Sequence, residues 1–403
     1  MESIKEIFRI GRGPSSSHTM GPVIAAMRYH ERHPDAKKFR VTLFGSLALT
    51  GKGHLTDIAI TEVLSPALTE IIWKKNKKKD FHPNALEFEV ADEGAAPDKW
   101  LVYSVGGGKI VDDSQKNTDP EMIYEQKNMQ DILAYYKETG KTFWELVFET
   151  EGEEIKEHLS EVWKTMQDAI KRGIEHEGLI PGGLKLQRKA SSYFIKSKRM
   201  KDHMATMSRI FAYALAVSEE NASGGVVVTA PTCGSSGILP AVLKITQEHY
   251  DLDDDHIIRA LATAGLVGNI VKHNASISGA EVGCQGEVGT ACAMAAAAAA
   301  QLAGGSPAQI EYAAEMGLEH HLGLTCDPIN GLVQIPCIER NVHAAARAFD
   351  SARYSLLSDG KHFIGFDVVT RVMKETGKDL PSLYRETALG GLAIFGDKDF
   401  VDN

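Results

Sequence analysis

The chain has 403 residues, which is long enough for two domains with separate hydrophobic cores. Hydrophobic residues make up 43% of it and charged residues 24%, the balance of an ordinary water-soluble protein. The net charge of −10 argues against a nucleic-acid or anionic-membrane surface, because both need a concentrated positive field.

The first part of the chain predicts helices interspersed with strands. Hydroxyl residues at 15–19 precede a segment, 20–33, whose apolar residues fit one helical face. A further helix is predicted over 57–73. Strands, rich in β-branched and aromatic residues, are predicted at 39–44, 85–90 and 100–105. This pattern predicts a mixed α+β or α/β unit of about 115–150 residues.

From about residue 119 the strand signal nearly vanishes and helical periodicity predominates. One β-like run remains, at 226–229. Helices are predicted at 122–136, 142–176, 196–219, 235–250, 255–272, 287–303, 306–320, 338–355 and 367–376. The predicted organisation is therefore a mixed α/β domain over 1–150, followed by a predominantly α-helical domain over 151–403.

Neither membrane insertion nor secretion is expected. The most apolar run, 293–303, is dominated by alanine and is too short to span a bilayer. No charged-then-apolar leader opens the chain, and its five cysteines lack the paired spacing of a disulfide framework. A cytoplasmic protein is expected.

Two segments rich in glycine or proline hold three of the five cysteines. Cys284 lies in GAEVGCQGEVG, and Cys326 and Cys337 lie in TCDPINGLVQIPCIERN. These cysteines are separated by 42 and 11 positions, so zinc-ribbon and bacterial ferredoxin spacings do not apply. Three dispersed thiolates are typical either of an iron–sulfur site with one iron lacking a protein ligand, or of three buried structural cysteines.

The other two cysteines are predicted to bind no metal. Cys233 lies in PTCGSSG before a predicted helix, where a thiol pKa can be lowered, so a nucleophile or a fourth ligand is the alternative. We expect its loop to shape a pocket. Cys292 lies within an alanine-rich helix and is expected to pack in the core.

A serine-rich loop, GPSSSHT at 13–19, is a candidate anion site. Backbone N–H groups at a helix start bind carboxylates well, and hydroxyl groups support them; simple helix capping is the alternative. His18 favours function, because a cap does not need a histidine. The hydroxyl residues predicted to contact substrate are Ser15, Ser16, Ser17 and Thr19.

Two further segments supply candidate contacts. In GKGHLTD, glycines flank Lys52 and leave the chain free to present Lys52 and His54, while Asp57 could orient the imidazole. In the segment 272–281, the side chains expected to hold the charged groups of an amino acid include Asn274 and Ser276, with Gly279 supplying backbone. Glu281 and Glu287 flank Cys284 and are candidates to pair an ammonium group.

Four segments together, GRGPSSSHTMGP, GKGHLTD, GAEVGCQGEVG and TCDPINGLVQIPCIERN, resemble the bacterial iron–sulfur-dependent L-serine dehydratases. The resemblance runs from about Ile7 to GGLA at 390–393. It marks Cys284, Cys326 and Cys337 as ligands of a 4Fe-4S cluster. It also implies that the first domain is similar to the allosteric substrate-binding domain of phosphoglycerate dehydrogenase, that the helical domain is catalytic, and that the protein is a homodimer.

The resemblance implies an L-serine ammonia-lyase, which forms pyruvate and ammonia. An open iron of the cluster would act as the Lewis acid for the hydroxyl leaving group. His54 is predicted to be the general base, with His18 as the other candidate. Some family members carry a cysteine at the extreme C-terminus that reaches into the active site. No cysteine follows Cys337 here, so capping of the open iron by the tail is not expected.

Two alternatives stay open at this point. A pyridoxal-phosphate dehydratase would use 234–237 (GSSG) to cradle the phosphate, but no lysine stands out for the Schiff base and the cysteines would be idle. An amino-acid-binding regulator or an iron–sulfur redox sensor would bind without catalysis. Iron analysis distinguishes an iron–sulfur enzyme from a pyridoxal-phosphate enzyme. Turnover of serine distinguishes an enzyme from a regulator or sensor.

Overall fold

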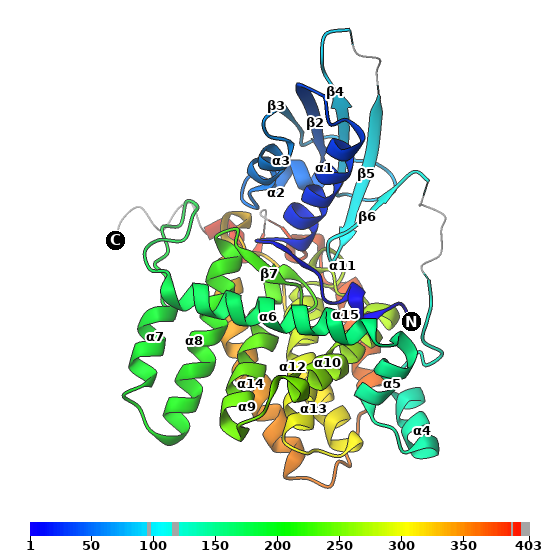
Figure 1. Ribbon diagram of the computed structural model, residues 1–403, viewed down its shortest axis with the longest axis vertical. Coiled ribbons are helices and arrows are strands. Elements are labelled where there is room, and N and C mark those ends of the chain that lie inside the picture. Colours follow the sequence, from blue (N-terminus) through cyan, green and yellow to red (C-terminus); the bar gives the residue numbers. More distant parts are fainter. Residues whose placement is uncertain (95–97, 115–120, 388–389, 396–403) are drawn as a thin grey trace.

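The computed structural model describes residues 1–94, 98–114, 121–387 and 390–395. A small sheet-containing unit stands on a larger helical unit (Figure 1). Each unit has its own buried hydrophobic core. This confirms the predicted fold class, a mixed α and β N-terminal unit followed by a predominantly helical one.

Five strands form a mixed sheet in the order β3-β2-β4-β5-β6. β2 runs parallel to β3, and the other neighbours are antiparallel. Apolar residues such as Tyr29 of helix α1 and Ile60 of α3 cover one face, while the ion pairs of Arg40 with Glu70 and Glu89 lie on the other. The elements are α1 (Gly21–Arg32), β2 (Lys38–Phe44), α2 (Gly45–Thr50), α3 (Thr56–Leu64), β3 (Leu68–Lys74), β4 (Ala85–Val90), β5 (Lys99–Gly106) and β6 (Lys109–Asp112).

The predicted strands at 39–44, 85–90 and 100–105 are confirmed as β2, β4 and β5. The predicted helix over 57–73 is wrong in its second half. Helix α3 stops before Pro66, because the residue preceding a proline is disfavoured in the helical region. The segment after it carries Ile71 and Ile72 and becomes β3, whose parallel pairing with β2 the local pattern did not reveal.

Helix α12 (Thr290–Leu302) runs through the centre of the helical unit and is buried from Thr290 to Ala300. Its alanines allow close approach: a Cβ added at Gly317 of α13 would lie 2.9 Å from Ala293 Cα. Within the described residues no helix is long and apolar enough to cross a membrane. The surrounding helices are α4 (Met129–Thr139), α5 (Phe143–Glu151), α6 (Glu154–Glu175), α7 (Ala190–Ser197), α8 (Asp202–Ala222), α9 (Ile238–Tyr250), α10 (Asp254–Asn274), α11 (Gly279–Val282), α13 (Pro307–Glu319), α14 (Cys337–Leu356) and α15 (Phe366–Asp379).

Two of the predicted helices are each interrupted. The prediction over 142–176 is divided into α5 and α6 at Gly152, whose φ of 73° lies in the left-handed region. The prediction over 196–219 is divided into α7 and α8, and Asp202 at the start of α8 also has a positive φ. The predictions from 235 onward are confirmed as α9, α10, α12, α13, α14 and α15.

The two cores draw on interleaved parts of the chain, and the predicted domains 1–150 and 151–403 stay a prediction. β1 (Ile10–Arg12) pairs with β7 (Val226–Val228) of the helical unit, and Ile7 is buried in the helical core. Helices α4 and α5 also contribute buried residues to that core. The sheet unit draws its own core from residues 24–110. The N-terminal strand therefore fastens the sheet unit to the helical one.

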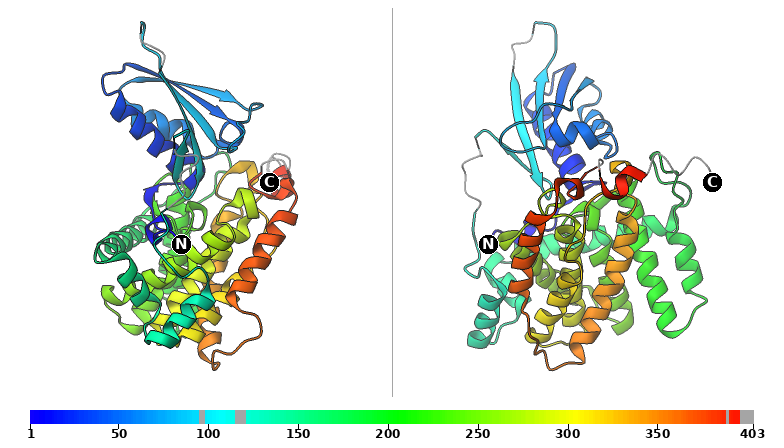
Figure 2. Two further views of the ribbon diagram at one scale, coloured as in Figure 1. Left: turned by 90° about the vertical axis from the view of Figure 1, so that its right-hand side faces the viewer. Right: turned by 180° about the vertical axis from the view of Figure 1, so that it is seen from behind.

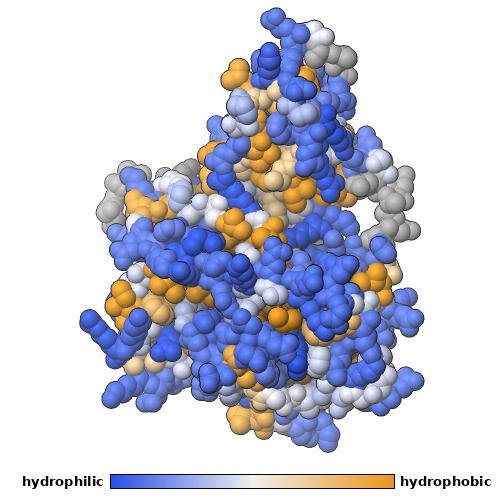
Figure 3. Space-filling model, in the orientation of Figure 1, coloured by the Kyte–Doolittle hydropathy of each residue, from blue (hydrophilic) through white to orange (hydrophobic). Residues whose placement is uncertain are grey.

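The C-terminal segment returns to the junction of the two units and crosses the top of the helical unit (Figure 2). Cys326 N donates to Tyr384 O at 2.8 Å, and Thr387 N donates to Cys326 O at 3.1 Å. Leu392 N donates to Asp327 Oδ2 at 2.8 Å. On the face shown in Figure 3, hydrophilic residues cover most of the surface and apolar residues form small separate groups. The predicted absence of capping by the tail concerns residues 396–403, outside the described residues.

Candidate active site

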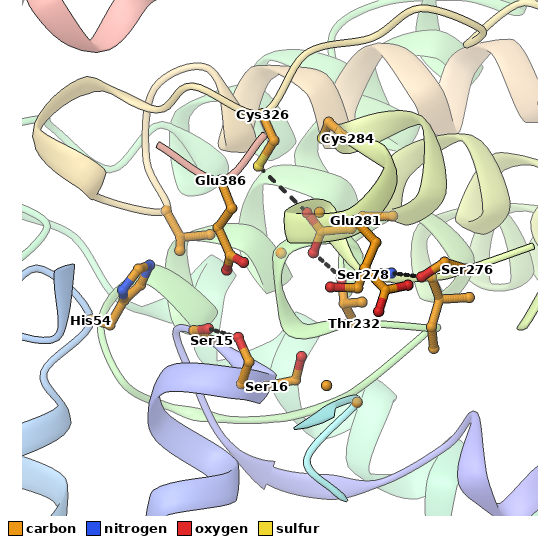
Figure 4. A pocket seen from close by; sticks show the side chains of 18 of the residues that line it. Ser15, Ser16, His54, Thr232, Ser276, Ser278, Glu281, Cys284, Cys326 and Glu386 are labelled. Atoms are coloured by element: carbon orange, nitrogen blue, oxygen red, sulfur yellow. Dashed lines mark hydrogen bonds between the residues drawn. The ribbon is translucent and has the colours of Figure 1, made fainter. Parts of the chain in front are cut away.

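A cavity of about 270 Å³ lies where the sheet unit, the helical unit and the C-terminal segment meet (Figure 4). Segments far apart in the sequence supply its walls. The lining residues include Ser15, Ser16, Ser17, His54, Thr232, Ser276, Gly279, Glu281, Cys284, Glu287, Cys326, Cys337 and Glu386.

Three cysteines face this cavity. Cys284 precedes α12, Cys326 lies on a loop, and Cys337 begins α14. A hydrogen bond joins the side chains of Cys284 and Cys326. It lowers the pKa of Cys284 and raises the pKa of Cys326 well above its usual value. The guanidinium of Arg340, one turn into α14, donates to Thr325 O at 2.6 Å and also lowers the pKa of Cys284.

These thiols have the chemistry of iron–sulfur ligands. Within the described ranges, no group of three or more His, Cys, Asp or Glu residues converges closely enough to hold one ion. A cluster distributes its ligands over several irons and takes thiolates as its donors. Cys284, Cys326 and Cys337 would supply three thiolates around one cavity, with a cationic side chain, Arg340, behind them.

The serine loop forms the start of a long helix. A π-helical turn, η2 (Ser16–Met20), runs directly into α1, and Ser15 caps it by accepting a hydrogen bond from His18 N at 3.1 Å. Asn221, near the end of α8, donates from Nδ2 to Pro14 O at 3.0 Å and anchors the loop. Ser15, Ser16 and Ser17 line the cavity at the positive end of this helix, an arrangement that suits a carboxylate.

The two predicted histidines lie side by side. The ring centroids of His18 and His54 are 4.5 Å apart, and only His54 lines the cavity. Burial lowers the pKa of His54 to about 4, so its imidazole is neutral near pH 7. The Thr19 hydroxyl donates to His54 O at 2.7 Å and the Thr56 hydroxyl to His18 O at 2.5 Å, which holds the two backbones together.

Comparison with known proteins identifies the family of the chain. The family model described as serine dehydratase alpha chain matches residues 67–393, and that of the serine dehydratase beta chain matches residues 3–70. The chain belongs to the serine dehydratase family. It is 42% identical to the L-serine dehydratase of Streptomyces coelicolor, covering 97% of this chain and 98% of that protein. It is 40% identical to the L-serine dehydratase of Haemophilus influenzae, covering 98% and 99%.

The junction of the two family models lies inside the sheet of this serine dehydratase. Residues 67–70, where the models overlap, lie at the start of β3. Strands β4, β5 and β6 consequently belong to the alpha-chain match, although they complete a sheet begun in the beta-chain match. The two parts of a serine dehydratase are therefore joined here through one continuous sheet.

Three predicted substrate contacts and one predicted orienting residue lie outside the cavity lining. The Thr19 side chain does not line the cavity, because its hydroxyl is used by the His54 carbonyl. Lys52 is exposed and its Nζ lies 5.8 Å from the centroid of the Trp73 ring. Asn274 donates from Nδ2 to the carbonyls of Lys127 and Ile270, away from the cavity. Asp57 accepts from the backbone of its neighbour Ile58 and makes no recorded contact with His54 within the described residues.

Other predicted residues do line the cavity. Ser276 and Gly279 reach it from the segment before Cys284. A Cβ added at Gly279 would lie 2.6 Å from Glu287 Oε2, so glycine permits this close approach. Glu287 accepts from the Thr232 hydroxyl at 2.8 Å, and its Oε2 lies 3.7 Å from Cys326 Sγ.

The two remaining cysteines, Cys233 and Cys292, lie outside the cavity lining. Cys233 is buried and does not line the cavity, whereas its neighbours Thr232 and Gly234 do. Burial raises the pKa of the Cys233 thiol, which argues against an activated nucleophile. Cys292 is buried in α12 and its Sγ donates to Ala344 O at 3.4 Å.

Sequence reasoning missed Glu386 and Arg340. Glu386 lies 49 positions beyond Cys337 in a segment without cysteine or histidine, so spacing gave no signal. The one available hint was that the family resemblance extends to GGLA at 390–393. Arg340 lies within the third cysteine segment and was detectable as a cation one helical turn from a thiolate.

Proposed function

We propose that the protein is an L-serine ammonia-lyase, which converts L-serine into pyruvate and ammonia. The observation that carries this proposal is convergence: three cysteines of the helical unit face the same cavity as the serine loop and His54 of the sheet unit. The relatives named as L-serine dehydratases, aligned over nearly the whole chain, support the same activity.

A 4Fe-4S cluster is part of this proposal. Cys284, Cys326 and Cys337 would hold it, and three protein thiolates leave one iron without a protein ligand. When bound, the cluster supplies a Lewis acid that stabilises the departing hydroxide of serine. Cys284 and Cys326 are buried and Cys337 is partly buried, which limits access of water to this end of the cavity.

The residues of the chain divide the remaining work. Ser15, Ser16 and Ser17 hold the substrate carboxylate at the start of the helix, and His54 takes the α-proton. As the Cα–H and Cβ–O bonds break, water leaves and 2-aminoacrylate forms. This enamine tautomerises to an imine, and water hydrolyses the imine to pyruvate and ammonia without further help from the protein.

The same geometry disfavours a pyridoxal-phosphate enzyme. Two lysines, Lys109 and Lys272, line the cavity within the described residues. Their Nζ atoms lie 2.8 and 2.7 Å from the carboxylate of Glu2. A Schiff-base lysine must instead be available as a neutral amine.

The proposal also includes the homodimer that the family resemblance implies. Light scattering measures the molecular mass in solution and so tests this oligomeric state.

The direct test is anaerobic purification followed by iron and sulfide analysis and a pyruvate assay with L-serine. We expect about four irons and four sulfides per chain, together with pyruvate formation. Pyruvate formation by an iron-free protein, or an absorption band of bound pyridoxal, would overturn the proposal. An iron–sulfur cluster in a protein that forms no pyruvate would favour a redox sensor.

Exposure to air is expected to abolish activity, and ferrous iron with thiol is expected to restore it. An iron that lacks a protein ligand is the one most easily lost on oxidation. The measurement follows pyruvate formation and iron content of one sample before aeration, after it and after reconstitution. Stable activity in aerated buffer with a chelator would contradict the open-iron mechanism.

A further inference from the structure

Glu386 reaches the cavity from the C-terminal segment. Its side chain is 21% exposed, and it is one of the residues that line the cavity. Figure 4 shows it between Cys326 and the serine loop, with His54 to one side. Its backbone has a φ of 46°, a left-handed conformation that is uncommon for glutamate. The flanking hydrogen bonds of Tyr384 and Thr387 to Cys326 hold this conformation in place.

A chain of hydrogen bonds ends on this carboxylate. Ser17 hydrogen-bonds Glu386, and Ser17 Oγ lies 2.9 Å from His18 Nδ1. On the other side of the ring, His18 Nε2 lies 3.1 Å from Ser46 Oγ. Burial lowers the pKa of His18 well below its usual value, so the ring is neutral and carries one proton. With the Ser17 hydroxyl donating to Glu386, the Ser17 oxygen accepts a hydrogen bond from His18 Nδ1–H. His18 Nε2 then carries no proton and accepts from the Ser46 hydroxyl.

The other carboxylates on the described part of the cavity wall are engaged or exposed. Glu6 forms ion pairs with Arg9 and Lys272. Glu287 is occupied by the Thr232 hydroxyl and faces Cys326. Glu281 is exposed to solvent. Glu386 differs from them because its partners are the neutral hydroxyl of Ser17 and a neutral imidazole, and no lysine or arginine pairs with it in any recorded contact among the described residues.

We propose that Glu386 recognises the α-ammonium group of the substrate. This inference rests on the proposed function, since it takes the substrate to be an amino acid. The serine loop receives the substrate carboxylate, and the Ser17 hydroxyl of that loop hydrogen-bonds Glu386. The carboxylate and the ammonium group on the substrate α-carbon therefore meet adjacent sites of opposite polarity. His18 is then a positioning residue, which acts on the substrate through Ser17 and Glu386.

The electrostatics agree with this assignment. Burial, followed by the charge of Glu287, raises the pKa of Glu386 to about 8. A partly buried carboxylate without a permanent cation is costly, and a bound ammonium would supply the missing charge. The expected consequence is selectivity: the site distinguishes an amino acid from the same molecule without its amino group.

The test compares two ligands in the holoenzyme and in Glu386→Gln. L-Serine carries the ammonium, and 3-hydroxypropanoate is the same molecule without it. In Glu386→Gln we expect the KM for L-serine to rise roughly ten- to a hundredfold, the range for losing a charge-assisted hydrogen bond. The inhibition constant of 3-hydroxypropanoate should stay constant or fall, because this ligand has no ammonium group to lose and a glutamine cannot repel its carboxylate.

Two further variants keep the result interpretable. Glu157→Gln, on the exposed face of α6, makes the same change in net charge outside the cavity and should leave both constants unaltered. Iron and sulfide content confirm that Glu386→Gln assembles its cluster. If it does not, Glu386→Asp keeps the charge but withdraws it by one methylene. That variant should raise the KM for L-serine by a smaller factor, with the inhibition constant again constant.

A parallel rise of both constants would overturn the inference, since it would indicate general distortion of the site. An unaltered KM with a reduced kcat would also overturn it, and would instead place Glu386 in proton transfer. If the wild-type protein forms no pyruvate, it is the proposed function that fails. The same two ligands are then compared by calorimetric binding, where loss of L-serine affinity alone still supports recognition of the ammonium.

Discussion

Replacing Cys326 with alanine is expected to remove both the iron–sulfur cluster and pyruvate formation. Cys326 hydrogen-bonds Cys284 and lies against Glu287, so it belongs to the thiol group that lines the cavity. Losing one of the three thiolates would leave two ligands for the proposed cluster, which already has an iron without a protein ligand. Iron and sulfide analysis after anaerobic purification, with the visible spectrum and a pyruvate assay, measures the outcome. Alanine at Cys284 or Cys337 should have the same effect.

Cys292→Ala is the matched control for these variants. Cys292 is equally buried, but it lies in α12, away from the cavity, and its Sγ contacts only the Ala344 carbonyl in the recorded hydrogen bonds of the described residues. Its replacement should lower stability slightly, by about 1 kcal/mol for the small cavity created, and spare the cluster. A Cys326→Ala protein with full iron content and normal turnover would show that the ligand assignment is wrong.

The fold was predictable where the local pattern and the tertiary environment agree. β-Branched and aromatic runs predicted β2, β4 and β5, and helical periodicity predicted α9, α10 and α12 to α15. β3 was missed because it follows α3 after only three residues, and its pairing with β2 is a long-range contact. The same limitation hid β1, whose partner β7 lies more than 200 residues away.

The candidate site was predictable where chemistry-bearing residues occur in distinctive segments. Three of the cysteines (Cys284, Cys326 and Cys337), the three serines of the serine loop and His54 lie in such segments and line the cavity. Lys52 shares a segment with His54 but points away, because sequence proximity does not determine the direction of a side chain. Glu386 could not be predicted, since its place in the cavity depends on pairing of the C-terminal segment with the Cys326 loop.

Replacing His54 with alanine is expected to abolish turnover while the cluster spectrum stays intact. His54 belongs to the sheet unit, whereas the three cysteines belong to the helical unit, so the variant should not disturb cluster assembly. The Thr19 hydroxyl bonds the backbone carbonyl of residue 54, and that contact survives the change. Loss of a general base costs on the order of a hundred- to ten-thousandfold in rate. Exchange of the serine α-proton with solvent deuterium should disappear together with pyruvate formation.

His18→Ala provides the comparison that decides the assignment, with both variants measured under anaerobic conditions. His18 lies behind the cavity wall and touches it through Ser17, so its loss should raise the KM for L-serine and reduce kcat much less than the loss of His54. Near-normal turnover in His54→Ala, with a severely impaired His18→Ala, would reverse the two roles. Two near-normal variants would remove the sheet unit from proton transfer, and the α-proton would then have to be taken by a group such as Glu386, on the C-terminal side of the cavity.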